Sequence, residues 1–389
     1  MERNPVNIVV HYDEIGLKGK NRPHFEHQLM RNIRRAFEGL GAVNTERLYG
    51  RVLVSLKARP PWDEVAGRMG RVFGISYFAR AYESPCDLNV LKARVKEQLP
   101  KDEYESFAID TKRSDKAFPL TSPEINRELG SFVQIETGKP VDLGNPDLRV
   151  CVEWLHDRVL FFFKRVPGPG GLPVGVSGKV VGLISGGIDS PVAIYLMMKR
   201  GCGVVFVHFH SFPFTDRASQ RKVTELAREL SHFRQMSKLY FVPFADLQRE
   251  VASRTPASYR IILYRRFMLR LAEAIARRER AKAVITGDSL SQVSSQTLSN
   301  LTTVEEAITI PVIRPLIGLD KKEIISLAQK IHTYPISIQP HDDCCQFLMP
   351  RQPFTRSTSE ELEEVEKDLD IRGLLDRTLA QAECHNLPR

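Results

Sequence analysis

Residues 180–190 read VVGLISGGIDS, and Pro191 follows them. The apolar run after Lys179 predicts a buried strand that ends at Ile184, and the residues up to Arg200 predict a helix. A buried strand joined to a helix by a glycine-rich loop is typical of doubly wound α/β sheets. This stretch therefore predicts the fold of the second half of the chain.

The residues after this loop repeat the alternation of strands and helices. We predict strands at 204–209, 238–244 and 283–286, and helices at 217–233 and 260–280. Strands that alternate with helices form a parallel sheet whose two faces are covered by the helices. Ligands of such sheets bind at the carboxyl ends of the strands, which is where the glycine-rich loop begins.

The loop itself carries groups that hold an anion. Gly186 and Gly187 allow a tight turn that presents backbone amides, and Ser185 and Ser190 can donate hydroxyl hydrogen bonds. The start of the following helix adds its positive dipole. Asp189 would repel phosphate by itself, so we assign it to Mg²⁺ or to the orientation of a loop amide. No lysine closes the loop, which excludes the GxxxxGK[ST] loop of P-loop ATPases.

The first 166 residues have the pattern of small α+β units. Strands at 6–11 and 51–56 enclose a helix at 23–40, and a second block of strands and helices follows. The stretch PGPGGLP at 167–173 is the clearest boundary in the chain. We therefore expect a domain at 1–60, a second at 61–166, a linker at 167–173, and a third domain at 174–389 that ends in an acidic helical tail.

The composition favours a soluble protein with polyanionic partners. Among 389 residues, 56 are basic and 47 acidic, giving a net charge of +9. Nucleic acid or nucleotides fit this balance, although a merely soluble basic surface explains it equally well. No apolar stretch approaches the ~20 residues that cross a bilayer, and the start has no signal-peptide pattern, so we expect a cytoplasmic protein without membrane contact. The six cysteines include no CxxC pair, so we expect no cysteine-bound metal site, neither zinc nor an iron–sulfur cluster.

Several segments carry a resemblance to known proteins. The loop SGGIDS at 185–190 resembles the pyrophosphate loop of the N-type ATP pyrophosphatases, which cleave ATP between its α and β phosphates. Other segments are similar to the tRNA 4-thiouridine synthetase (tRNA sulfurtransferase) family: GLPVG at 171–175, HFHS at 208–211, GDSLSQVSSQT at 287–297, IRPLIGLDK at 313–321 and PHDDCC at 340–345. The stretch KRSDKAFP at 112–119 resembles a THUMP domain. The resemblance implies a multidomain α/β protein with a ferredoxin-like domain, a THUMP domain and a PP-loop ATP pyrophosphatase domain.

The resemblance also implies a reaction, in which ATP adenylates O4 of the uridine at position eight of tRNA and persulfide-derived sulfur then displaces AMP. Asp189 and Lys321 match residues that the family uses in adenylation, although Lys322 shows that a lysine at a helix start is commonplace. Besides the loop residues, the positions that would hold ATP are Leu183, Ile184, His208, Phe209, Arg265, Gly287 and Gln296. From the local sequence alone, Arg265 fits a solvated helix face equally well, and His208 fits a core histidine.

A thiol must carry the sulfur, and Cys344 matches the reactive cysteine of the family. Some members hold the persulfide on a C-terminal rhodanese-like domain, but the chain ends 45 residues after Cys344, too few for such a domain. We therefore expect Cys344 to receive sulfur directly from a cysteine desulfurase, with Cys345, Cys202 or Cys384 resolving the persulfide. The same absence argues against a further role in sulfur transfer for thiamine thiazole synthesis.

For RNA, the resemblance points to Lys112, Arg113 and Lys116, because basic side chains on a THUMP-like segment suit tRNA phosphates. A homodimer would let one subunit present tRNA to the other. Two alternatives differ in class. A PP-loop ATP pyrophosphatase could adenylate another RNA base or a small molecule, as in the GMP synthetase type, but the N-terminal half would then lack a purpose. A catalytically inactive RNA-binding protein is disfavoured by the intact loop.

Overall fold

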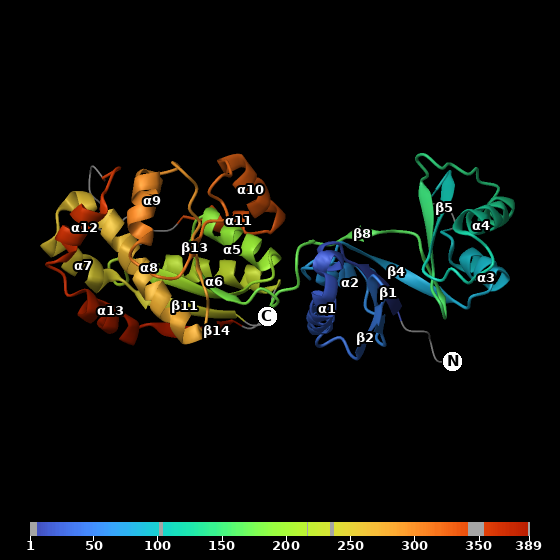
Figure 1. Ribbon diagram of the computed structural model, residues 1–389, viewed down its shortest axis with the longest axis horizontal. Coiled ribbons are helices and arrows are strands. Elements are labelled where there is room, and N and C mark those ends of the chain that lie inside the picture. The colour runs from blue at the N-terminus through green and yellow to red at the C-terminus, as the bar shows by residue number, and fades with distance from the viewer. Residues whose placement is uncertain (1–5, 101–103, 216, 234–236, 341–353, 388–389) are drawn as a thin grey trace. The chain divides into compact units, whose positions relative to one another are not determined.

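The computed structural model describes residues 6–100, 104–215, 217–233, 237–340 and 354–387. The chain divides into two compact units, Met1–Leu172 and Pro173–Arg389. Figure 1 labels their helices and strands and colours the chain by residue number. Within the described ranges, no helix combines the length and the apolarity that crossing a bilayer requires.

The first unit begins with a βαββαβ arrangement. Its four strands pair antiparallel in the order β2-β3-β1-β4, which is the order of a ferredoxin-like sheet. Helix α1 ends four residues before the predicted position, because Phe37 leaves helical geometry and Gly39 adopts a positive φ of 87°. The elements are β1 (Val6–His11), η1 (Glu14–Asn21), α1 (Arg22–Ala36), β2 (Val43–Leu48), β3 (Arg51–Leu56), α2 (Trp62–Met69) and β4 (Tyr77–Ser84).

The second half of this unit extends the same sheet. Strand β4 continues the order as β4-β7-β6-β5, so that it belongs to both halves, as its path from the blue to the teal region of Figure 1 shows. Thr121 and Glu124 form a capping box at the start of α4, and Gly138 ends it at φ 69°. The elements are α3 (Leu88–Gln98), β5 (Phe107–Arg113), α4 (Ser122–Thr137), β6 (Leu148–Trp154), β7 (Val159–Phe162) and β8 (Val166–Pro167).

The second unit is built on a six-stranded sheet in the order β13-β12-β9-β10-β11-β14. The first five strands are parallel, which confirms the predicted doubly wound fold. The last strand pairs antiparallel with β11, so the acidic tail ends in a strand rather than being helical throughout. The strands are β9 (Lys179–Leu183), β10 (Gly203–His210), β11 (Ser237–Pro243), β12 (Val284–Ile285), β13 (Val312–Ile313) and β14 (Glu383–Leu387).

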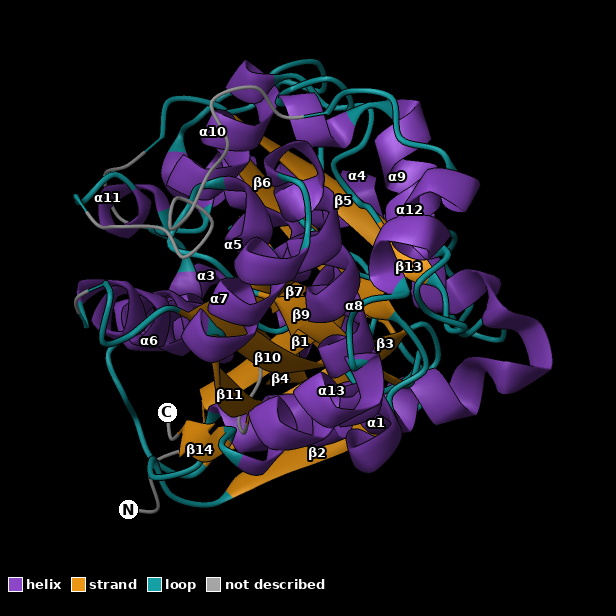
Figure 2. Cartoon of the chain, turned by 90° about the vertical axis from the view of Figure 1, so that its left-hand side faces the viewer, coloured by secondary structure: helices purple, strands orange, loops and turns teal. Residues whose placement is uncertain are grey.

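Helices cover both faces of this sheet (Figure 2). Successive buried residues of β9 point to opposite faces, and both sets pack against helices. Val181 packs with helix α8, whereas a Cβ atom at Gly182 would lie 2.8 Å from the Ile194 side chain of helix α5. The helices are α5 (Asp189–Lys199), α6 (Ala218–Ser231), α7 (Ala245–Arg254), η2 (Ala257–Tyr259), α8 (Arg260–Glu279), η3 (Ser294–Gln296), α9 (Leu298–Glu305), α10 (Lys321–Lys330), α11 (Tyr334–Ser337), α12 (Ser359–Glu366) and α13 (Ile371–Ala380).

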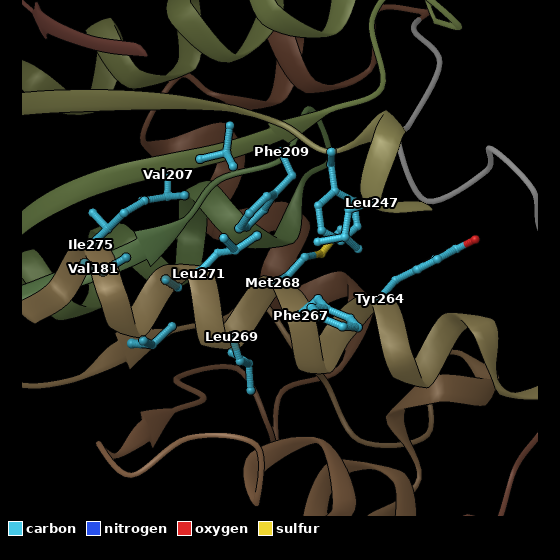
Figure 3. Packing of buried hydrophobic residues seen from close by; sticks show 14 of the residues in the cluster. Val181, Val207, Phe209, Leu247, Tyr264, Phe267, Met268, Leu269, Leu271 and Ile275 are labelled. Atoms are coloured by element: carbon cyan, nitrogen blue, oxygen red, sulfur yellow. The ribbon is translucent and has the colours of Figure 1, made fainter. Parts of the chain in front are cut away.

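The core on the α8 side ends at the carboxyl edge of the sheet. Val207 and Phe209 of β10 point toward Leu271 and Met268 of α8, as Figure 3 shows, and all four side chains are buried. Fully burying a side chain of this size contributes about 1.5–3 kcal/mol to the free energy of folding. This packing fixes α8 against the strand ends, where the candidate site lies.

Candidate active site

A cavity of about 460 Å³ opens at the carboxyl ends of β9, β10 and β12. One wall is apolar and comes from α8, which contributes Ile261, Tyr264, Met268 and Leu269 at helical spacing. The opposite wall is the polar loop between β9 and α5. Of the predicted ATP-binding residues, the cavity is lined by Leu183, Ile184, Ser185, Gly187, Asp189, Ser190, His208, Phe209, Arg265, Gly287 and Gln296, whereas Gly186 is not part of the lining.

The loop is closed by hydrogen bonds between its two serines. The Ser185 amide donates to Oγ of Ser190 at 2.8 Å, and the two hydroxyl oxygens lie 3.1 Å apart. The Gly187 amide donates to Oγ of Ser185 at 3.3 Å. From helix α11, the Ser337 hydroxyl donates to the Gly187 carbonyl oxygen at 3.2 Å. These contacts hold the loop in one conformation without using the dipole of α5, so the helix start remains suited to an anion.

Asp189 lies at the start of α5 and is held by side chains from two distant segments. Lys321 Nζ lies 2.6 Å from its Oδ1, and Nε2 of Gln292 donates to its Oδ2 at 2.9 Å. Lys321 is the first residue of α10, whose capping box is formed by Asp320 and Glu323. The structure therefore brings together the two residues that the resemblance assigned to adenylation. Gln292 was missed, since a glutamine in a polar loop gives no local signal.

A buried carboxylate, Asp288, organises the floor of the cavity. Arg265 donates to its Oδ1 at 2.6 Å and Thr286 to its Oδ2 at 2.7 Å, while Arg314 lies 3.5 Å from Oδ2. Burial by itself raises the pKa of Asp288, but the Arg265 guanidinium, Thr286, Arg314 and Gln296 outweigh it and hold the pKa below its usual value. Arg265 is thus neither on a solvated helix face nor free of protein partners, because it also donates to the Ser295 carbonyl oxygen at 2.9 Å.

Asp288 was not among the residues predicted for the site, although it belongs to the quoted GDS stretch. The signal that could have found it is its position three residues after β12, beyond the carboxyl end of a central parallel strand.

The structure explains why a glycine is needed at position 287, which the sequence alone did not. A Cβ atom at this position would lie 2.8 Å from the Ser190 nitrogen and 2.9 Å from its Cα. The strand end therefore touches the backbone of α5 directly. The close approach that glycine allows here is between the segment after β12 and the start of α5, so it helps to position the loop that precedes α5.

His208 combines the two readings left open by the sequence. Its side chain is buried, and Nδ1 lies 3.0 Å from the Ile184 carbonyl oxygen, so it ties β10 to the end of β9. It also lines the cavity.

The basic residues predicted for RNA binding differ in their surroundings. Lys112 and Lys116 are exposed on the first unit. Arg113 is half-buried, and its guanidinium donates to the carbonyl oxygens of Asp115 and Leu120. Arg113 therefore closes the loop that follows β5, while the two lysines are the ones available to phosphate.

The predicted sulfur carriers divide into two groups. Cys344 and Cys345 lie outside the described residues. Cys202 is buried at the amino end of β10, where burial raises the pKa of its thiol. At about 3.3 Å per residue, Cys202 lies roughly 17–23 Å along the strand from the cavity-lining residues Val207–Phe209. Cys384 is exposed on β14, opposite Tyr240.

In the described part of the chain, no three His, Cys, Asp or Glu side chains gather as a metal site. One carboxylate, Asp189, stands at the phosphate loop. A single carboxylate together with substrate phosphates is a common way of holding Mg²⁺.

Comparisons with known proteins agree with this geometry. The family model for the thiamine biosynthesis protein (ThiI) matches residues 175–371, the ThiI ferredoxin-like domain matches 7–79, and the THUMP domain matches 88–163. A probable tRNA sulfurtransferase of Thermus thermophilus is 48% identical over 97% of this chain and 92% of its own length. That of Moorella thermoacetica is 41% identical over 97% of this chain and 96% of its own.

Among solved structures, a crystal structure of a 4-thiouridine synthetase–RNA complex with bound ATP is 39% identical, with a TM-score of 0.90, and the match covers 99% of this chain and 100% of that one. PH1313 from Pyrococcus horikoshii is 26% identical with a TM-score of 0.63. These matches confirm the expected succession of a ferredoxin-like domain, a THUMP domain and a PP-loop domain.

Proposed function

The chain belongs to the tRNA sulfurtransferase (ThiI) family, and we propose that it is the enzyme that uses ATP to convert uridine eight of tRNA to 4-thiouridine. Membership makes it an ATP-dependent tRNA sulfurtransferase. The single observation that carries the finer proposal is the cavity itself, where an apolar wall meets the glycine-rich loop and Asp189, whose carboxylate is held by Lys321.

We assign the two walls of the cavity to the two ends of ATP. Tyr264 and Met268 offer apolar surface to the adenine ring, and the backbone at the ends of β9 and β10 offers hydrogen bonds to its edge. The glycine-rich loop between β9 and α5 and the start of α5 then hold the phosphates. Mg²⁺ would be held by Asp189 and the phosphates, and when bound it neutralises phosphate charge.

The chemistry requires that a poor leaving group be replaced. O4 of uridine attacks the α-phosphate, the bond to the β-phosphate breaks, and pyrophosphate leaves. The ammonium of Lys321 can stabilise the charge that develops on this leaving group. The base is then an adenylate, whose C4 is electrophilic because AMP can depart.

For the sulfur step we assign the nucleophile to Cys344, charged as a persulfide by a cysteine desulfurase. The terminal sulfur attacks C4 and AMP leaves, which joins the base to the enzyme through a disulfide. A second thiolate then attacks the Cys344 sulfur, which releases 4-thiouridine and leaves a protein disulfide. The burial of Cys202 at the other end of β10 argues against it as this second thiol, leaving Cys345 and Cys384.

The proposal includes a homodimer that works in the cytoplasm. A role in thiamine synthesis, which the family description names, is not part of it. The alternative substrate is another RNA base, with the same ATP chemistry.

One experiment tests the proposal. The protein is incubated with ATP, Mg²⁺, a sulfide source and unmodified tRNA, and thiolated uridine is followed by its absorbance together with pyrophosphate release. We expect both products, and we expect neither when the uridine at position eight is replaced by cytidine. Thiolation that persists on the cytidine-substituted tRNA would assign the enzyme to another base. Pyrophosphate release without thiolation would favour a different acceptor.

A further inference from the structure

The turn after β10 exposes two aromatic rings beside the cavity. Residues 211–215 read SFPFT, and the side chains of Phe212 and Phe214 are 38% and 46% exposed. Phenylalanine is usually among the most buried residues, so two exposed rings in one short turn are unusual. Exposed apolar surface of this kind commonly marks an interaction site.

Each ring is accompanied by an arginine. The Arg217 guanidinium lies 4.7 Å from the centre of the Phe212 ring, and that of Arg249 lies 5.1 Å from the centre of the Phe214 ring. The two arginines come from different elements, the residue before α6 and the helix α7. The turn thus combines flat π surfaces with positive charge, which is the combination that binds nucleic acid bases and their phosphates.

The turn is held in place by its own hydrogen bonds, so the exposure of the rings is built into the fold. The Ser211 hydroxyl donates to Oε1 of Gln248 at 2.6 Å, and both side chains are fully buried. The amides of Phe214 and Thr215 both donate to the Ser211 carbonyl oxygen, at 2.8 and 3.1 Å. A rigid aromatic surface loses little conformational entropy when it binds.

The same contacts place the turn next to the nucleotide cavity. Phe209 lines the cavity, and Phe212 follows three residues later, which is at most about 10 Å of chain. Tyr264, on the apolar wall, donates its hydroxyl to the Gln248 carbonyl oxygen at 3.2 Å. A base adjacent to the reacting uridine would therefore come within reach of these rings.

We propose that Phe212 and Phe214 form a stacking platform for unpaired bases of the tRNA next to the target uridine. This inference rests on the proposed function and names the part of its substrate that the catalytic unit itself recognises. A uridine must leave the stacked interior of the RNA before its O4 can meet the α-phosphate of ATP. Its exposed neighbours then need a new stacking partner, and aromatic side chains are the usual one in RNA recognition.

The test compares Phe212→Ala and Phe214→Ala with the wild-type protein in steady-state thiolation. Loss of one base–aromatic stack corresponds to a fall of roughly 5- to 150-fold in affinity. We expect the KM for tRNA to rise within this range while the affinity for ATP and the salt dependence of tRNA binding stay unchanged. Phe212→Tyr should restore the wild-type KM. Leu298→Ala, a change at a 69% exposed leucine of the same unit, is the control and should have no effect.

Two sulfur sources separate this proposal from docking of the protein that donates sulfur. With inorganic sulfide as the donor, a stacking defect persists, whereas a defect seen only with a cysteine desulfurase would overturn the proposal in favour of a protein partner. Wild-type KM values in both alanine variants would also overturn it. If instead the wild-type protein makes no 4-thiouridine, the proposed function itself is wrong, which this comparison distinguishes from a failure of the stacking proposal.

A spectroscopic measurement does not depend on the alanine variants folding. Phe212→Trp places an indole at the platform, and stacking on a base quenches its fluorescence. We expect quenching by tRNA but not by ATP, measured against the wild-type protein, whose two tryptophans provide the background. Absence of tRNA-dependent quenching in a variant that still binds tRNA would overturn the proposal.

Discussion

Lys321 Nζ lies 2.6 Å from the Asp189 carboxylate, although 132 residues separate the two in the chain. The pair links the start of α5 to the start of α10, and both side chains keep contact with solvent, with 44% and 21% of the Lys321 and Asp189 side chains exposed. A partly exposed ion pair contributes little to stability. From its position at the phosphate loop, we therefore propose that the pair serves catalysis rather than folding.

We predict that Lys321→Ala lowers kcat for thiolation roughly 100-fold while the melting temperature stays within a degree or two. Asp189→Asn should have an effect of similar size. If the two residues act as a unit, kcat of the double variant should be no lower than that of the slower single variant. Comparing kcat of the two single variants and the double variant tests this. Lys322→Ala, at the next position of α10, is the matched control and should keep the wild-type rate. Equal losses in the two lysine variants would contradict the assignment of Lys321.

Asp288→Asn should destabilise the protein, because it leaves Arg265 and Arg314 without the buried carboxylate that both face. Removing one partner of a buried ion pair costs about 3–5 kcal/mol in the free energy of unfolding. Urea unfolding of both proteins at pH 7 measures the difference. A loss below about 1 kcal/mol would show that the arginines find other partners.

The same carboxylate predicts a pH dependence. Because the folded-state pKa of Asp288 lies below the unfolded value of about 3.9, its contribution is fully present above about pH 4 and is lost as the pH falls through the folded-state pKa. The stability difference between wild type and Asp288→Asn should therefore be constant from pH 8 to about pH 5 and shrink only in stronger acid. If the stability difference between the two proteins already falls between pH 7 and pH 5, the pH dependence arises from a group other than Asp288.

The sequence predicted the parallel sheet and the phosphate loop because both are local patterns. Strand β9 and the loop up to Ser190 form one continuous stretch, and their chemistry can be read without knowing the fold. The contacts of Asp189 with Gln292 and Lys321 could not be predicted in this way, because they join segments more than 100 residues apart. Only the resemblance pointed to Lys321, and Gln292, although it lies in the quoted stretch 287–297, was given no role.

Strand β14 was missed for a related reason. It lies at the edge of the sheet, and four of its five side chains are exposed, so Glu383–Leu387 shows neither an apolar run nor a clean alternation. Strand β2 at Val43–Leu48 is likewise an edge strand with a single buried residue, Thr45. Edge strands are specified by their partner's free hydrogen-bonding groups more than by their own sequence.

Cys202→Ser should retain wild-type thiolation, since the thiol is buried at the amino end of β10 and its raised pKa keeps it protonated near neutral pH. With a cysteine desulfurase as the sulfur donor, Cys344→Ser is the positive control and should abolish the reaction. Multiple-turnover assays with and without a dithiol reductant compare both with the wild-type protein. A Cys202→Ser variant that completes one turnover and then stalls without reductant would identify Cys202 as the resolving thiol after all.

For tRNA binding, we predict that Lys112→Gln and Lys116→Gln each lower affinity and reduce the slope of log K against log salt by up to about one, because each exposed lysine neutralises one phosphate. Arg113→Gln should behave differently, since its guanidinium is used to close the loop after β5. Salt titrations of tRNA binding distinguish the two kinds of residue. An Arg113 variant that changes only the slope, with an unaltered melting temperature, would make Arg113 a phosphate ligand.

The last prediction concerns Gly287, which packs against the start of α5 and also lines the cavity. In Gly287→Ala the new Cβ would lie 2.8 Å from the Ser190 nitrogen, so β12 and the start of α5 must move apart. Overpacking of this kind costs about 1–3 kcal/mol, and the displaced loop should bind ATP more weakly. Gly318→Ala is the matched control, because nothing lies within 4 Å of the added atom. In Gly287→Ala, both the ATP affinity measured by calorimetry and the free energy of unfolding measured in urea should fall. In Gly318→Ala, neither should change. If Gly287→Ala loses stability but binds ATP normally, the glycine serves the packing of α5 alone, and the loop tolerates a shift of its own helix.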